Sequence, residues 1–317
     1  MKTQRPPAVV ALGGGHGLSA SLLALKQVTD DLTAIVTVAD DGGSSGRLRD
    51  ELGMLPPGDL RMALSALSGD DDWSRTWTRL LQHRFVSDGP LAGHAVGNLI
   101  LAGLTQDLGM VEALDLVGRL VGARGRVLPA STTPLEIVAE VVGLDPSDPS
   151  AVERVVGQVA VATTTGDVCA LHLLPEDPPA CPEAVQAVLD ADVVVLGPGS
   201  WLTSVITHLL VPDLRDALVK TPAQLVVALN LAPQPGETEG YSPETHLEVL
   251  LAHAPELSVD VVVADEDRVL DRHGLMESVE SAGGRLVLAP VSLGDGTPRH
   301  DPDRLAAVYR DILKGSA

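Results

Sequence analysis

Short apolar runs recur along the chain, and most of them lead through glycines into a stretch with helical periodicity. "AVVAL" (8–12) precedes the glycines of residues 13–17 and the helix-like "LSASLLALK". The stretch "DVVVLGPGSWLTSVITHLL" (192–210) repeats this design, with Ser200 placed to begin its helix. Similar runs are "TAIVTVA" (33–39), "QLVVALN" (224–230), "VDVVVAD" (259–265) and "RLVLAP" (285–290). Near-continuous apolar runs are typical of strands buried on both faces, so the pattern predicts a parallel sheet covered by helices.

Segments with helical periodicity lie between these apolar runs. They lie at 93–106, 111–122 and 182–191, and the alternation of strand and helix predicts an α/β fold, Rossmann-like, with a doubly wound and mostly parallel sheet. The stretch from about 126 to 174 instead contains several short strand-like runs without helices, with "LDPSDPS" (144–150) as a turn among them. We therefore expect a single domain over residues 1–317, with a small β-rich insertion at about 126–174.

Composition narrows the classes of function. Of the 317 residues, 45% are apolar, which excludes a disordered chain, and only 2% are aromatic. The net charge of −21 would repel a phosphate backbone, and the few rings leave little for base stacking, so we expect no nucleic-acid partner. No apolar run is long enough to predict a membrane span. Two cysteines, Cys169 and Cys181, make neither a disulfide framework nor a zinc site, so a reducing cytoplasm is the expected compartment.

Three polar loops follow predicted strands, and the carboxyl ends of parallel strands are where such sheets bind ligands. The first is "GGGHG" (13–17), where glycines would let a phosphate approach the backbone and the N-terminus of the following helix. Leu18 breaks the strict dinucleotide fingerprint, which disfavours a dehydrogenase. His16 is either a solvent-facing turn residue or a contact to phosphate or substrate.

The second loop, "DDGGSSG" (40–46), places Asp40 and Asp41 a little over twenty residues after the first. These acids fit ribose hydroxyls, or a magnesium ion shared with phosphates, or simply a flexible solvated turn. Arg47 and Arg61 behind the loop bring positive charge that would bind phosphate or pair with nearby acids such as Asp59. The acidic run 70–72 is expected to be a solvated loop.

Other candidates lie farther along the chain. Residues 197–200 predict a second anion-binding helix start. His94 and Asn98 are polar positions on an otherwise apolar helical segment, while Asn230, Gln234 and Thr238 offer neutral hydrogen bonds to a base or sugar. The chain contains no HExxH, GxSxG or Walker motif, so metalloprotease, hydrolase and P-loop chemistry are disfavoured.

Most of the chain resembles the gluconeogenesis factor family of bacterial cytoplasmic proteins, relatives of 2-phospho-L-lactate transferase. The resemblance runs in order through "ALGGGHGLS", "TAIVTVADDGGSSGRLRDELGMLPPGDLR", "LLQHRF", "LAGHAVGNLILAGL", "GRVLPAS", "ADVVVLGPGSWLTSVITHLLVP", "QPGETEGY" and "PRH". The low aromatic content of this chain and its many Ala, Val, Asp and Arg residues are similar to those of actinobacterial members of the family.

The resemblance implies a nucleotide ligand, with UDP-sugars such as UDP-N-acetylglucosamine reported for the family, and a role in gluconeogenic growth, cell-wall synthesis and cell shape. We therefore expect a cytoplasmic regulatory factor that binds a nucleotide sugar, with magnesium as a candidate cofactor. A homo-oligomer and cell-wall regulatory proteins are candidate partners. The alternative is a magnesium-dependent transferase that moves a phospholactyl group from a guanosine donor to a deazaflavin.

On this hypothesis the glycine loops 13–17 and 197–200 hold the diphosphate, Asp40 or Asp41 binds ribose or magnesium, and Arg299 closes over the phosphates. No catalytic residue is assigned. The predicted ligand-binding residues are Gly13, Gly14, Gly15, His16, Gly17, Asp40, Asp41, Ser44, Ser45, Arg47, Asp59, Arg61, His94, Asn98, Gly197, Gly199, Ser200, Asn230, Gln234, Thr238 and Arg299.

Overall fold

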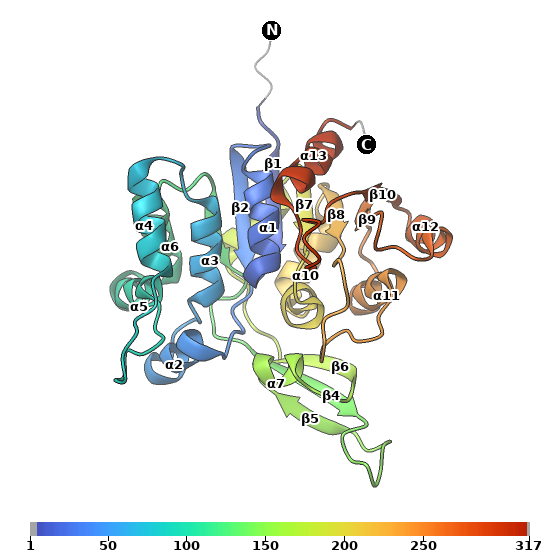
Figure 1. Ribbon diagram of the computed structural model, residues 1–317, viewed down its shortest axis with the longest axis horizontal. Coiled ribbons are helices and arrows are strands. Elements are labelled where there is room, and N and C mark those ends of the chain that lie inside the picture. The colour runs from blue at the N-terminus through green and yellow to red at the C-terminus, as the bar shows by residue number, and fades with distance from the viewer. Residues whose placement is uncertain (1–4, 316–317) are drawn as a thin grey trace.

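A parallel seven-stranded sheet forms the centre of the protein (Figure 1) in a computed structural model that describes residues 5–315. Its order is β10-β9-β8-β7-β1-β2-β3. The strands are β1 (Ala8–Gly13), β2 (Asp31–Val36), β3 (Arg126–Pro129), β7 (Val193–Leu196), β8 (Gln224–Ala228), β9 (Val261–Asp265) and β10 (Arg285–Ala289). In register, Leu12 lies opposite Ile35 on one side and Leu196 on the other. The predicted Rossmann-like α/β fold is confirmed.

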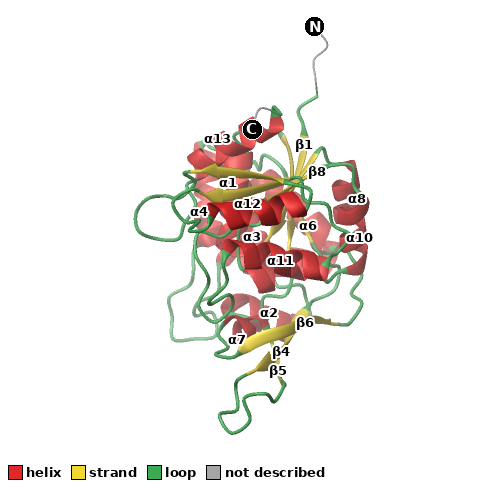
Figure 2. Ribbon diagram, turned by 90° about the vertical axis from the view of Figure 1, so that its right-hand side faces the viewer, coloured by secondary structure: helices red, strands yellow, loops and turns green. Residues whose placement is uncertain are grey.

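Helices cover both faces of this sheet (Figure 2). On one face α1 (Gly15–Leu25) packs between α3 (Gly58–Leu67) and α13 (Pro302–Leu313), and on the other α8 (Pro182–Asp190) packs beside α10 (Pro212–Lys220). The remaining helices are α2 (Gly43–Leu52), α4 (Asp72–Gln82), α5 (Val96–Leu108), α6 (Met110–Leu120), α7 (Gln158–Ala162), the π-helical turn η1 (Trp201–Ile206), α9 (Thr207–Leu209), α11 (Pro243–His253) and α12 (Arg272–Ser281).

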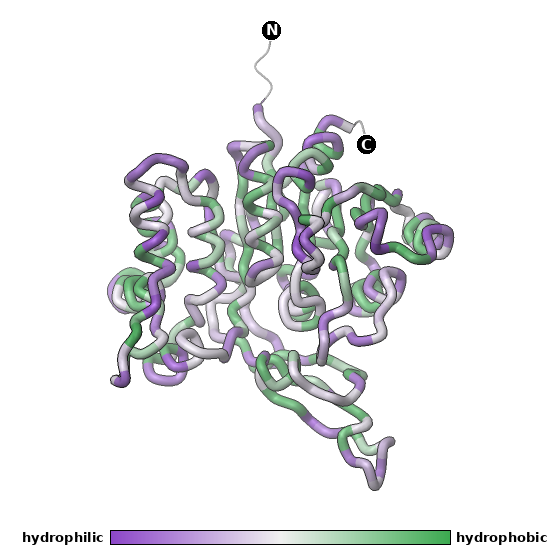
Figure 3. The backbone as a smooth tube through the Cα atoms, viewed as in Figure 1, coloured by the Kyte–Doolittle hydropathy of each residue, from purple (hydrophilic) through white to green (hydrophobic). Residues whose placement is uncertain are grey.

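The core is aliphatic, as the composition requires. The central strands form the green interior in Figure 3, and Leu12, Ala34, Ile35 and Val194 are completely buried. Burial of each such Leu, Ile or Val side chain stabilises the fold by about 1.5–3 kcal/mol. Between residues 5 and 315 no helix combines the length and apolar character needed to cross a membrane.

A small antiparallel sheet projects from the carboxyl edge of the large one (Figure 1). It consists of β4 (Glu136–Val142), β5 (Glu153–Val156) and β6 (Asp167–Leu174) in the order β5-β4-β6. The predicted insertion at about 126–174 therefore begins too early. Its first strand, β3, pairs in parallel with β2 and forms an edge of the large sheet. A short apolar run does not reveal which sheet it joins, so the sequence pattern could not separate β3 from β4.

Two stretches predicted as loops begin helices instead. The glycine-serine stretch after Asp41 opens α2, where a Cβ atom on Gly46 would collide with the Asp41 carbonyl. This glycine therefore serves close packing. In the acidic run 70–72, Asp71 accepts a hydrogen bond from the Ser74 backbone N–H (3.0 Å) and caps α4.

Candidate functional site

The site lies where the strand order reverses. From β1 the chain continues through β2 to β3 on one side of the sheet, and from β7 it continues through β8 and β9 to β10 on the other. The carboxyl ends of the adjacent strands β1 and β7 lead into the two glycine loops, and a cleft of about 710 Å³ opens there. Of the predicted residues, those that line the cleft are Gly14, Gly15, His16, Gly17, Asp40, Asp59, Gly199, Ser200, Asn230, Gln234 and Arg299.

The first glycine loop brings the backbone of α1 to the cleft. Gly15 has a φ of +56°, and a Cβ atom on Gly14 would stand 2.6 Å from the Asp59 carboxylate. Gly17 packs so closely on Pro198 that a Cβ atom there would collide with its carbonyl. In the described chain the N–H groups of His16 and Gly17 have no acceptor, because the hydrogen bonds of α1 begin with Leu18, which donates to the Gly14 carbonyl at 3.2 Å. The backbone N–H groups at the start of α1 can therefore donate hydrogen bonds to a ligand.

Most of the backbone donors at the second glycine loop are already bound within the protein. Asn230 accepts from the Gly199 N–H (3.0 Å) and donates to the Gly199 carbonyl (2.7 Å). The N–H groups of Leu202 and Thr203 both donate to Glu237, at 2.6 and 2.8 Å. The expectation that this helix start is free to bind an anion is wrong, because the carboxylate of Glu237 already occupies it.

Glu237 is the residue that closes this helix start, and the sequence reasoning missed it. Its side chain is buried, and the Ser200 hydroxyl lies 2.7 Å from both of its oxygens. Burial raises the pKa of Glu237, while the Ser200 hydroxyl and the two backbone N–H groups oppose this rise. Nothing in "QPGETEGY" distinguishes Glu237 from its exposed neighbour Glu239, since only the fold brings it to η1.

The two acids of the second polar loop separate in space. Asp40 lines the cleft, and its carboxylate accepts from the Gly42 N–H at 2.9 Å. Asp41 does not line the cleft, because it accepts from the Val159 N–H (3.0 Å) and so fixes α7 of the small sheet. The acid that joins Asp40 in the cleft is Asp59, at the start of α3.

Asp40 and Asp59 form the charged centre of the cleft. Burial, and next the negative charge of Asp40, raise the pKa of Asp59 to about 7 from an ordinary value of 3.8, while the Gly15 N–H and Arg61 oppose this rise. Two adjacent carboxylates are hard oxygen donors of the kind that magnesium binds together with phosphates. Within residues 5–315 no cluster of three or more Asp, Glu, His or Cys side chains has metal-binding geometry. Magnesium would therefore need oxygen ligands from a bound phosphate as well.

Four predicted residues form a separate buried network that joins α2, α3 and α5. Asn98 donates to Ser44 (3.0 Å) and accepts from Arg61 (2.9 Å), and the Ser44 hydroxyl lies 3.0 Å from His94 Nδ1. Arg61 also donates to Gln82. Burial lowers the pKa of His94, and burial together with nearby Arg84 lowers that of Arg61 to about 10. None of the four lines the cleft, so their polar groups bind one another and are not placed to bind a ligand there.

The remaining predicted residues are distributed around the cleft. Arg299 lines it and pairs with Asp295 (2.6 Å). Thr238 lies outside the lining, where its hydroxyl accepts from the Gln234 N–H at 2.8 Å. Four other predicted residues also lie outside the lining: Gly13, Gly197, Ser45 and Arg47. Gly13 ends β1, and the Gly197 N–H donates to the Leu12 carbonyl at 3.1 Å. Ser45 packs beside Gly58, and Arg47 donates to the carbonyls of Pro90 and Ala92 at 3.2 and 2.7 Å.

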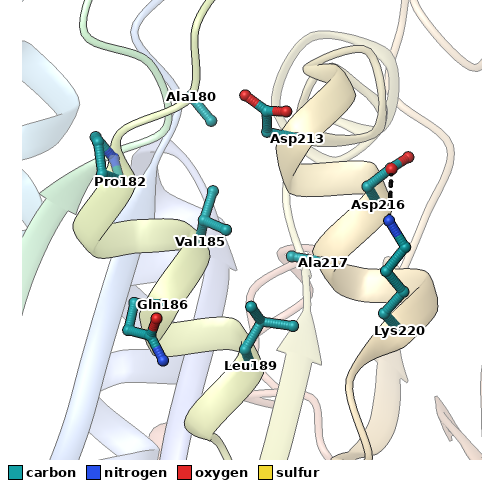
Figure 4. Close-up of a pocket in the computed structure, with 9 residues that line it drawn as sticks. All are labelled: Ala180, Pro182, Val185, Gln186, Leu189, Asp213, Asp216, Ala217 and Lys220. Atoms are coloured by element: carbon teal, nitrogen blue, oxygen red, sulfur yellow. Dashed lines mark hydrogen bonds and ion pairs between the residues drawn. The ribbon is translucent and has the colours of Figure 1, made fainter.

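A second hollow lies between α8 and α10 and has a volume of about 390 Å³ (Figure 4). Val185, Leu189 and Ala217 line it, with Lys220 and Asp216 paired at 2.8 Å on its rim. It is a groove between two helices, away from the strand ends, and none of the predicted site residues lines it. The cleft at the sheet edge is therefore the better candidate.

The sequence is similar to those of known proteins. The model of the CofD family, described as 2-phospho-L-lactate transferase CofD, matches residues 9–283. The "Gluconeogenesis factor" of Bacillus subtilis is 36% identical over 97% of this chain and 98% of its own length. Two mycobacterial proteins are also named as gluconeogenesis factors. The protein of Mycobacterium leprae is 52% identical over 98% of this chain and 87% of its own length. The protein of Mycobacterium tuberculosis is 53% identical over 96% of this chain and 90% of its own length.

A solved structure extends the similarity to three dimensions. A Bacillus halodurans protein of the UPF0052 family superimposes with a TM-score of 0.85 and is 33% identical, over 96% of this chain and 99% of that one. The higher identity of the mycobacterial proteins fits the actinobacterial composition of this sequence. By sequence and by fold, the chain belongs to the CofD family and, within it, to the gluconeogenesis factors.

Proposed function

We propose that the cleft binds the diphosphate of a nucleotide sugar, with a UDP-sugar as the expected ligand, and that the protein acts as a regulatory factor through this binding. The observation that carries the proposal is the open start of α1, where the N–H groups of His16 and Gly17 have no acceptor in the described chain and line the cleft. A helix N-terminus with free N–H groups and a positive dipole end favours a phosphate.

The opposite wall suits the neutral part of such a ligand. Asn230 and Gln234 carry amide groups that donate and accept, and both line the cleft. Arg299 on the segment before α13 adds a positive charge to the same cleft. The regulatory role rests on the relatives' name, gluconeogenesis factor, and on the resemblance to that family.

Calorimetric titration with UDP-N-acetylglucosamine tests the binding proposal. Gly15→Ala should weaken binding about tenfold or more, because its methyl group stands where the phosphate would approach the backbone. Gly283→Ala is the matched control. Gly283 has a φ of +83°, so alanine strains the backbone there as it does at Gly15, and no atom lies within 4 Å of the added methyl group.

The two variants should lose similar stability, about 1 kcal/mol each, while only Gly15→Ala loses affinity. Equal losses of affinity would show that backbone strain and not the cleft is responsible. If the wild-type protein bound no uridine, guanosine or nicotinamide nucleotide, the proposal would be wrong.

A transferase activity is the second candidate, and the pair Asp40–Asp59 favours it. Burial and the charge of Asp40 keep the proton on Asp59 up to a pH of about 7. A magnesium ion bound by the two carboxylates would displace this proton to solvent and would neutralise charge on the phosphates. In the reaction that the resemblance implies, a deazaflavin hydroxyl attacks the phosphorus that carries the lactate, and GMP leaves as the bond from that phosphorus to the guanosine phosphate breaks. No Phe, Tyr or Trp lines the cleft as the structure describes it, which disfavours a deazaflavin.

Turnover of a guanosine diphospho-lactate donor with a deazaflavin acceptor and magnesium distinguishes the two functions. We expect no turnover above background. If GMP is released at a rate that Asp59→Asn abolishes and Asp50→Asn does not change, the protein is a transferase. Asp50 is the control because it is an exposed carboxylate on α2.

A further inference from the structure

Helix α7 contacts both of the polar loops that flank the cleft, and in Figure 1 it lies with the small sheet below the large one. At the start of α7 the Val159 N–H donates to Asp41 at 3.0 Å. At its end the Ala162 carbonyl lies against the loop after β8, where a Cβ atom on Gly236 would stand 2.7 Å from it. The helix is therefore held in place at both ends.

Gln158 is the first residue of α7, and its side chain lines the cleft. The sequence reasoning did not identify it as a site residue. Its amide oxygen Oε1 is buried, and within residues 5–315 no donor binds it. A buried acceptor without a hydrogen bond is unfavourable, so a ligand that donates to this oxygen also removes the cost of leaving it unpaired.

The other two amide side chains that line the cleft differ from Gln158 in this respect. Asn230 Oδ1 accepts from the Gly199 N–H at 3.0 Å, and Gln234 Oε1 accepts from the Trp201 N–H at 3.3 Å. Among the amide side chains that line the cleft in the described part of the chain, only Gln158 therefore has an oxygen without a partner.

The acceptors near α7 fit a ligand group that carries hydrogen-bond donors. The loop of Asp40 lies against the helix, since a Cβ atom on Gly42 would stand 3.3 Å from the Val159 side chain. An ionised Asp40 and the Gln158 oxygen can only accept hydrogen bonds. The oxygens of a diphosphate are also acceptors, whereas each hydroxyl of a sugar can donate. This side of the cleft therefore fits the sugar of a nucleotide sugar better than its diphosphate.

We propose that Gln158 recognises the sugar, with its amide oxygen accepting a hydrogen bond from a hydroxyl or an acetamido N–H of that sugar. The diphosphate binds the N–H groups of His16 and Gly17, and the sugar extends from the start of α1 toward α7. The small sheet thus supplies the residue that distinguishes a nucleotide sugar from the free nucleotide. This inference rests on the function proposed above and adds the residue that selects the sugar.

Calorimetric titration with UDP and with UDP-N-acetylglucosamine tests the inference. Methionine is unbranched like glutamine but has no amide. Gln158→Met should therefore weaken the binding of UDP-N-acetylglucosamine about tenfold and change that of UDP by no more than about twofold. Gln106→Met is the matched control, because Gln106 is exposed on α5 and does not line the cleft. It should leave both dissociation constants unchanged.

Gln158→Glu separates the acceptor oxygen from the rest of the side chain. It keeps an acceptor, and its negative charge should weaken the binding of both ligands by a similar factor. The ratio of the two dissociation constants should therefore stay near that of wild type, whereas Gln158→Met changes it about tenfold. Urea unfolding should show that all variants are folded.

The possible failures are distinguishable. If Gln158→Met weakened UDP and UDP-N-acetylglucosamine equally, or weakened neither, Gln158 would not recognise the sugar. A wild-type protein that bound UDP but not UDP-N-acetylglucosamine would overturn the inference as well. In each of these cases the cleft could still bind a nucleotide diphosphate. A wild-type protein that bound no nucleotide would overturn the proposed function, and the inference with it.

Discussion

Replacing Glu237 by alanine should lower the free energy of unfolding by about 3–4 kcal/mol. The change leaves the N–H groups of Leu202 and Thr203 and the hydroxyl of Ser200 without their shared acceptor in a buried region. Each hydrogen bond to a charged group contributes about 1.5–3 kcal/mol, and partial relaxation of the loop reduces their sum. Urea unfolding of wild type and variant measures the difference.

Two further variants separate the role of the carboxylate from a general effect of the loop. Glu239→Ala removes an exposed carboxylate two residues away and should change stability by no more than about 0.5 kcal/mol. Glu237→Gln keeps one acceptor oxygen and should fall between wild type and Glu237→Ala. Equal stability of Glu237→Ala and Glu239→Ala would mean that Glu237 does not cap η1.

The fold could be predicted largely because strands buried on both faces leave a direct mark in the sequence. The runs 8–12, 192–196 and 259–265 match β1, β7 and β9 to within two residues, and the glycines after the first two runs are at the strand ends. What the pattern could not supply was the partner of a short strand. The run at 126–129 pairs with β2, although residues 37–125 with helices α2 to α6 lie between the two strands, and no local feature of the run indicates that pairing.

Contacts between residues far apart in the sequence also decide which polar groups meet in the candidate site. Asp40 and Asp41 are adjacent in sequence, yet one lines the cleft and the other fixes α7. The acid that Asp40 meets, Asp59, was predicted as a site residue but not as the partner of Asp40. The first glycine loop was simpler to interpret, since its donors belong to the helix that directly follows it.

The donors of the second glycine loop were misjudged for the same reason. A helix start looks open in sequence whenever no acid lies in its first turn, and η1 has none there. The carboxylate that binds it comes from a residue over thirty positions later (2.6 Å to the Leu202 N–H). The same applies to Ser44, Arg61, His94 and Asn98, whose polar character predicted a ligand and whose partners are one another.

Asp59→Asn should make the protein more stable than wild type above about pH 7, by about 2 kcal/mol. Burial and the charge of Asp40 raise the pKa of Asp59 to about 7, so the folded state keeps a proton that the unfolded state releases from about pH 4 upward. Wild-type stability is therefore highest below the ordinary Asp pKa and falls as the pH rises toward 7. The full shift corresponds to about 4 kcal/mol, and the remaining exposure of Asp59 reduces it.

Urea unfolding at about pH 5 and about pH 8 measures this effect as the difference between wild type and variant, which cancels the titration of the histidines. Asp59→Asn should lose less stability between the two pH values than wild type, whereas Asp50→Asn, an exposed change on α2, should follow wild type. Excess magnesium at the higher pH should stabilise wild type and not Asp59→Asn, because the ion would bind the ionised pair formed with Asp40. If the free energy of unfolding changed with pH equally in all three proteins, Asp59 would not hold a proton in the cleft. The proposed magnesium site at Asp40 and Asp59 would then be wrong as well.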